Sequence, residues 1–112
     1  MDANEYQRLA MRSASSSRQG IGSLITAALG LCGESGEFAD HVKKHYAQGH
    51  SLDVEKLAEE IGDVCWYVAL ACQALGLDLA EVMAANVEKL RRRYPDRFSS
   101  ESSIKRVDAA GG

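Results

Sequence analysis

The stretch GESGE at residues 33–37 is followed, 22 residues later, by EIGD at residues 60–63. Each stretch carries a pair of carboxylates spaced i,i+3, and each lies in a segment whose apolar residues recur at helical spacing. Residues three apart on an α-helix lie on the same side, about one turn from each other. If the two helices pack together, the four carboxylates therefore meet in one pocket.

Four carboxylates that converge in this way need a counterion, because like charges at close range cannot all stay ionised. A hard divalent cation takes oxygen ligands and meets this need. A single acidic pair is also common on a solvated helix face, so the prediction depends on finding two pairs, both beside apolar stripes. The predicted metal ligands are Glu34, Glu37, Glu60 and Asp63.

The ligand set favours a magnesium-class ion over iron or zinc. Iron-binding helical bundles use Glu-x-x-His, and no histidine stands three residues after any of these acids. His41 and His45 have the i,i+4 spacing that can bind zinc, but there is no HExxH pattern, and we expect them to be solvated or helix-terminal. We expect Mg²⁺ as the cofactor, with Mn²⁺ as a substitute.

Periodicity and helix-breaking residues predict an all-α fold, a small bundle of one short and three longer helices. Ser51 or Asp53 can cap the third helix, Gly76 can end it, and Pro95 should end the fourth at or before Tyr94. A Ser/Gly loop is expected over 13–23. We expect helices over residues 3–13, 24–47, about 54–75 and from Asp78 onward, in one domain (1–98) with a flexible tail (99–112).

Apolar stripes mark the faces that we expect to form the core. The second helix contributes Leu24, Ala28, Leu31, Phe38, Val42 and Tyr46. The third helix contributes Val54, Leu57, Ala58, Ile61, Val64, Cys65, Val68, Cys72 and Leu75. The odd count of cysteines and the lack of a CxxC motif favour buried, reduced thiols at Cys32, Cys65 and Cys72.

Three glycines, Gly30, Gly33 and Gly36, recur within the second helix. Each costs about 1 kcal/mol relative to alanine in a helix interior, so three together need a reason. A close approach of another helix or a ligand is one explanation, and a kink or break in the helix is the other.

Composition sets further bounds. The chain has 112 residues and a net charge of −3, which argues against general nucleic-acid binding. No apolar run approaches the roughly 18 residues of a membrane-spanning helix, and the N-terminus lacks the features of a signal peptide. We therefore expect a cytoplasmic protein with neither membrane nor nucleic-acid partners.

The acidic motif and its surroundings resemble a known family. The segments LGLCGESGE (29–37), LAEEIGDVCWY (57–67) and NVEKLRRRYP (86–95) are similar to successive elements of the MazG-type all-α nucleoside triphosphate pyrophosphohydrolases. The likeness covers roughly residues 3–98. The family motif is Glu-Glu-x-x-Glu, a spacer, then Glu-x-x-Asp, and its first Glu is Gly33 here, as in many short members. Glu59 is a further acid beside the motif, at an angle that makes it a poor ligand.

The resemblance implies an enzyme that hydrolyses NTPs or dNTPs between the α and β phosphates, releasing a monophosphate and pyrophosphate. It implies Mg²⁺ held by the four carboxylates, which would also be the catalytic residues, with Glu34 or Glu37 accepting the proton of the attacking water. It also implies a homo-oligomer, a dimer or tetramer, and a role in cleaning the nucleotide pool.

The sequence predicts the substrate-binding residues less precisely than the metal ligands. Arginine grips phosphate through paired hydrogen bonds, and three residues of the fourth helix share one face at i, i+3, i+7. The alternative for Arg91–Arg93 is that they only complement the helix C-terminus. Lys44 is a weaker phosphate candidate. Tyr67, one turn after Asp63, is placed equally well in the site or in the core. The predicted substrate-binding residues are Tyr67, Asn86, Lys89, Arg93 and Tyr94.

A different class of function stays open at this stage. The chain could be a non-catalytic helical interaction or regulatory module with a vestigial metal site. It would then show no turnover, and its oligomerisation would depend on metal. Nucleic-acid binding through Arg91–Arg93 is a third hypothesis, and the net charge of −3 argues against it.

Overall fold

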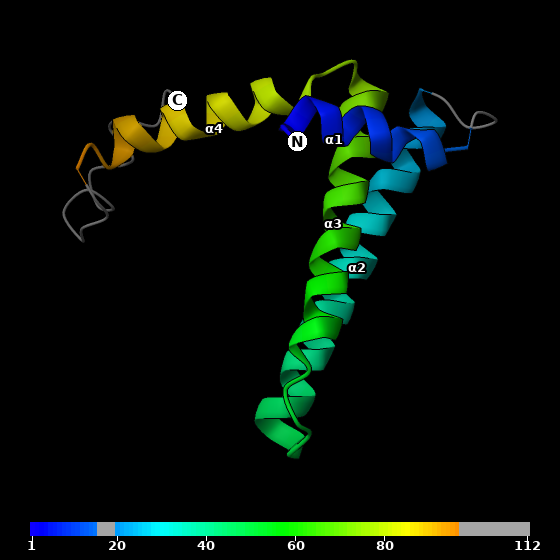
Figure 1. The fold of residues 1–112 in the computed structure, drawn as a ribbon, viewed down its shortest axis with the longest axis vertical. Helices are drawn as coiled ribbons and strands as arrows, with labels where there is room; N and C mark the ends of the chain where they lie inside the picture. The colour runs from blue at the N-terminus through cyan, green and yellow to red at the C-terminus, as the bar shows by residue number, and fades with distance from the viewer. Residues whose placement is uncertain (16–19, 97–112) are drawn as a thin grey trace. The chain divides into compact units, whose positions relative to one another are not determined.

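The computed structural model describes residues 1–15 and 20–96, and these residues are helical without strands, as predicted. The expected tail, 99–112, lies outside the described residues. The chain divides into two units, Met1–Asp78 and Leu79–Gly112. The elements are α1 (Ala3–Ala10), the short 3-10 helix η1 (Met11–Ser13), α2 (Ile21–Gln48), α3 (Val54–Leu75) and α4 (Leu79–Arg93), the last in the second unit (Figure 1).

The centre of the first unit is an antiparallel hairpin of α2 and α3, which run side by side along their length (Figure 1). Ala27 and Ala69 are completely enclosed in it, and Leu70 and Cys72 are buried. Two of these four side chains are single methyl groups, so the helix axes can approach closely. The hairpin sets which faces of the two helices meet.

Caps fix the ends of the hairpin helices. Gly49 adopts φ +73° and its N–H bonds the Lys44 carbonyl, which ends α2. Of the two predicted caps for α3, Asp53 is the one used, because its Oδ1 accepts from the Lys56 N–H at 3.0 Å. Gly76, at φ +69°, ends α3 as predicted. Helix α2 begins at Ile21, earlier than the predicted Leu24.

Helix α1 is tied to α3 by polar contacts. The buried Gln7 side chain donates to the Leu77 carbonyl at 3.0 Å. From α3, the Trp66 indole N–H reaches the Ala10 carbonyl at 3.1 Å and the Ser13 Oγ at 2.8 Å. These contacts give Trp66 a structural role in joining α3 to α1 and η1.

The predicted core stripes are only partly buried, which corrects the expectation. Leu24, Leu31 and Phe38 are half-buried, whereas Tyr46 is 89% exposed and Val54 67% exposed. None of the large side chains of the described residues is fully buried. A two-helix hairpin covers one face of each helix, and the apolar stripes are wider than that face. Further residues of the two stripes that are exposed are Ala28, Val42, Ala58, Ile61, Cys65 and Leu75.

The cysteine prediction was right for one residue and wrong for two. Cys72 is buried and its burial raises the pKa of the thiol, whereas Cys32 and Cys65 are exposed. Cys65 belongs to the part of the α3 stripe that the hairpin leaves uncovered, and Cys32 lies on α2 next to the half-buried Leu31.

Only one of the three helix glycines is closely approached. The Tyr67 ring of α3 lies directly against Gly30, in the space that a Cβ atom would occupy. Gly33 and Gly36 face open space, and α2 runs through all three glycines without a break. The close-approach explanation is therefore confirmed for Gly30 alone, and a break in the helix is excluded.

Helix α4 ends where Pro95 predicted. Its last residue is Arg93, and the Tyr94 N–H still bonds the Leu90 carbonyl at 2.8 Å. Arg91 pairs with Glu88 at 3.8 Å along the same helix.

Over the described part of the chain, no single helix has both the length and the apolar character needed to cross a membrane, although α3 and α4 taken together pass the same test of length and composition.

We expect opposite effects from two glycine substitutions in α2. Gly30→Ala should lower the free energy of unfolding by about 1–3 kcal/mol, because the new methyl group forces the Tyr67 ring to move. Gly33→Ala should raise it by about 1 kcal/mol through helix propensity, since nothing stands in its way. Urea unfolding followed by circular dichroism measures both. Equal changes in the two variants would contradict this packing of Tyr67.

Candidate metal centre

The hairpin brings three of the four predicted carboxylates together. Glu34 and Glu37 come from α2 and Glu60 from α3, and oxygens of all three lie within 4.8 Å of one another. Glu60 is 2% exposed, Glu34 is half-buried and Glu37 is exposed. A cluster that is closed on one side and open on the other can admit a cation from solvent.

The buried oxygens of this cluster fit a cation. Glu60 turns its Oε1 toward His41 Nε2 at 3.5 Å and Lys56 Nζ at 3.7 Å. Its Oε2 and the Oε2 of Glu34 are buried and have no hydrogen-bond partner among the described residues. Buried polar atoms are normally satisfied, and carboxylate oxygens are the ligands that Mg²⁺ prefers. The residues present therefore suit a hard divalent ion.

The carboxylates of the cluster shift the pKa values of one another in opposite directions. The hydrogen bond with Glu60, burial, and the charges of Glu37, Asp63 and Glu60 together raise the pKa of Glu34. Burial alone would raise the pKa of Glu60, but hydrogen bonding with Glu34 and Glu37 and the charges of Lys56 and His41 outweigh it and lower this pKa. Without a metal, Glu34 is therefore protonated more readily than Glu60.

Asp63 stands apart from the three clustered carboxylates. It lies one turn after Glu60 on α3, is exposed, and is not part of the group of three. Its charge still contributes to the raised pKa of Glu34, and after burial and Cys65 it contributes to the raised pKa of the Tyr6 hydroxyl. Asp63 therefore stands at the rim of the cluster, near α1.

Two basic residues of the site were not predicted as part of it. Lys56 precedes Glu60 by one helical turn, an i,i+4 pair that the sequence displays. His41 follows Glu37 by one turn, but its contact with Glu60 depends on how α2 and α3 pack. His45 instead contacts the His50 carbonyl at 2.7 Å through Nδ1, so the two histidines do not converge as a zinc pair.

The predicted substrate-binding residues fall into two groups. Tyr67 lies in the first unit, half-buried against Gly30, with its ring 5.0 Å from that of Trp66 in an edge-to-face arrangement. The other four belong to the second unit, where helical spacing puts three of them on one face of α4 and the fourth directly follows the helix. Their roles in binding stay predictions. These four are Asn86, Lys89, Arg93 and Tyr94.

An apolar hollow of about 210 Å³ lies between the hairpin helices. It is lined by the residues that directly follow the four predicted ligands, and one residue corresponds to a rotation of about 100° on a helix. The hollow therefore occupies the face of the hairpin next to the acidic one. The lining residues are Ser35, Phe38, Ile61 and Val64.

Comparison with known proteins confirms the resemblance. Residues 23–98, more than half of the chain, match the model of the MazG nucleotide pyrophosphohydrolase domain. The chain therefore belongs to the MazG nucleotide pyrophosphohydrolase family, whose all-α fold agrees with the helices described above.

A curated relative comes from a phage. Over 69 residues the chain is 38% identical to the "Gene 37 protein" of Mycobacterium phage L5. The aligned segment covers 58% of this chain and 60% of the relative, so the chain spans less than two thirds of the relative's length. No solved structure matches the chain significantly.

We expect the metal-free protein to lose stability as the pH rises above the ordinary glutamate value near 4.5. The folded state holds the Glu34 proton more tightly than the unfolded chain does, so this contribution is complete below the ordinary pKa and is lost as the pH rises through the raised one. Glu60, whose pKa is lowered, makes the opposite kind of contribution, which is lost as the pH falls through its pKa rather than as the pH rises. Melting temperatures in EDTA from about pH 4 to 8 measure the effect.

The variant Glu34→Gln supplies the control, because an amide keeps a hydrogen-bond donor and cannot ionise. Its melting temperature should change less over the same range. A slope equal to that of the wild-type protein would contradict the raised pKa of Glu34.

Proposed function

We propose that this protein is a Mg²⁺-dependent nucleoside triphosphate pyrophosphohydrolase that releases NMP or dNMP and pyrophosphate, as a cytoplasmic enzyme of the nucleotide pool. The observation that supports it is the cluster of Glu34, Glu37 and Glu60, with its two unsatisfied buried oxygens, inside a MazG domain. Asp63, at the rim, completes the proposed ligand set.

A divalent ion held there would neutralise phosphate charge and lower the pKa of a bound water. The chain's own residues have three tasks. Lys56 and His41 keep Glu60 ionised and in place. Glu37, the exposed member of the cluster, and Glu34, with its raised pKa, are the candidates for accepting the proton of the attacking water. The substrate-binding set predicted above would hold the nucleotide, with Lys89 and Arg93 on its phosphates.

The proposal is tested by incubating the protein with a panel of NTPs and dNTPs, with Mg²⁺ and with EDTA, and separating the products by chromatography. Monophosphate and pyrophosphate that form only with metal are expected. In the same assay, Glu60→Ala and Asp63→Ala should reduce turnover at least about 100-fold without loss of helicity, because each removes a proposed ligand.

Glu59→Ala is the matched control, since Glu59 is adjacent in sequence but exposed, where it pairs with Lys56 at 3.7 Å. It should keep nearly full activity. Diphosphate and phosphate as products would overturn the proposed reaction. An absence of product from a folded, metal-loaded protein would favour the interaction module instead.

We propose further that the protein works as a homo-oligomer, in which a second copy covers the apolar face of the hairpin. The argument is the partial burial of both stripes, with the hollow at Phe38 and Val64 between them. Two hairpins laid face to face would form a four-helix arrangement and enclose these side chains. The same face lies next to the acidic cluster, so a partner would also help to wall the site.

Two isoleucines provide a matched test of this interface. Ile61 lines the hollow and Ile25 does not, yet both are 53% exposed, so neither substitution removes a core contact. Ile61→Lys should shift the protein toward a single chain in sedimentation velocity, because a charge would be buried in the interface. Ile25→Lys should leave the oligomeric state measured by sedimentation unchanged. A monomeric wild-type protein, or equal effects of both variants, would contradict the proposal.

A further inference from the structure

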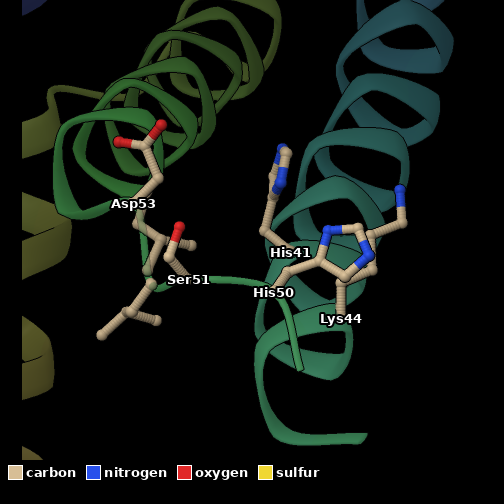
Figure 2. Close-up of a pocket in the computed structure, with 7 residues that line it drawn as sticks. His41, Lys44, His50, Ser51 and Asp53 are labelled. Carbon is tan, nitrogen blue, oxygen red and sulfur yellow. The ribbon is translucent and has the colours of Figure 1, made fainter. Parts of the chain in front are cut away.

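A second cavity lies at the closed end of the hairpin, where α2 turns into α3. Its volume is about 280 Å³. Figure 2 shows His41 and His50 on the α2 side, with Ser51 and Asp53 on the other side at the start of α3. Lys44 and two leucines complete the lining.

The position of His50 is fixed by the end of α2. Its N–H bonds the Lys44 carbonyl at 3.1 Å, and its carbonyl lies 2.7 Å from His45 Nδ1. Gly49, at φ +73°, makes this turn possible. The backbone of His50, one of the lining residues, is therefore held at both its N–H and its carbonyl.

The lining is biased toward groups that bind anions. His41, Lys44 and His50 can each donate a hydrogen bond or carry positive charge, and the Ser51 hydroxyl can donate as well. The single carboxylate of the lining, Asp53, is engaged with the Lys56 N–H at 3.0 Å. Basic groups therefore outnumber acidic groups around the cavity by three to one.

Lys44 can turn toward an anion in the cavity without leaving the Asp40 carboxylate unpaired. Its Nζ pairs with Asp40 at 2.9 Å, but Lys43 also reaches Asp40, at 3.5 Å. If Lys44 swings into the cavity, Lys43 remains as the partner of Asp40.

The cavity adjoins the acidic cluster through one side chain. His41 lines the cavity and also lies 3.5 Å from Glu60 Oε1. A ligand that spans the acidic cluster and the cavity would have a metal-binding part at the carboxylates and an anionic part at the hairpin end. A polyphosphate chain has both properties.

We propose that this cavity is a phosphate subsite, which binds the pyrophosphate end of the nucleotide through His50 and Lys44. This inference depends on the proposed function for its substrate. The expectation is that His50→Gln and Lys44→Gln each raise KM for the triphosphate about tenfold, the loss of one charge-assisted hydrogen bond, with kcat changed by less than about twofold.

The control is Lys43→Gln, which removes the same charge from the neighbouring residue and from the same Asp40 pair, but outside the cavity. It should leave KM unchanged. Calorimetric titration with inorganic pyrophosphate in Mg²⁺ gives a second readout that needs no turnover. Its Kd should rise about tenfold in the two cavity variants, while the Kd of a nucleoside monophosphate stays the same.

The outcomes separate the two proposals. If the wild-type protein hydrolyses nucleotides but the cavity variants match Lys43→Gln, the subsite is wrong and the proposed function stands. If monophosphate binding weakens instead, the cavity holds the nucleoside end and the inference is overturned. If the wild-type protein hydrolyses nothing, the proposed function fails, and pyrophosphate titration of the same variants still decides whether the cavity binds phosphate.

Discussion

A carboxylate enclosed between two helices is the constraint on which the rest of this structure depends. Glu60 is 2% exposed, and a buried charge without partners costs several kcal/mol. Lys56 and His41 compensate for it at one oxygen, and the raised pKa of the neighbouring Glu34 favours the neutral form of that second carboxyl group. This arrangement requires α2 and α3 to meet in one register, which the completely buried Ala27 and Ala69 allow. The geometry of the candidate site therefore depends directly on how α2 and α3 pack against each other.

The local structure was largely readable from the sequence. Helix ends at Gly49, Gly76 and Pro95 follow from backbone conformations that few other residues favour, and Asp53 offers a cap that the backbone uses. The i,i+3 spacing of the acids, together with the expectation that the two helices pack against each other, predicted that Glu34, Glu37 and Glu60 would meet. The start of α2 was placed too late, because the Ser/Gly composition before Leu24 is typical of a loop.

What the sequence could not supply depends on the rotation of one helix against another. Periodicity identifies an apolar face but not how much of it a partner covers, so Cys32 and Cys65 were expected inside and are exposed. For the same reason Asp63 shares a face with Glu60 on α3 but stands outside the group of three. The contact of His41 with Glu60 joins residues of different helices, and no spacing within one helix predicts it.

The short turn that closes the hairpin has a consequence for how such a chain can change length. The residues between Glu37 and Glu60 form the outer ends of α2 and α3 and the turn between them, all on one side of the acidic cluster. Adding whole helical turns to both arms together would move the hairpin end outward and leave the carboxylates opposite each other. A single residue added to one arm would instead rotate every position beyond it by about 100°. Insertions here should therefore be tolerated in matched pairs of turns, and the cavity at the hairpin end would then move away from the carboxylates by about 5.4 Å per turn.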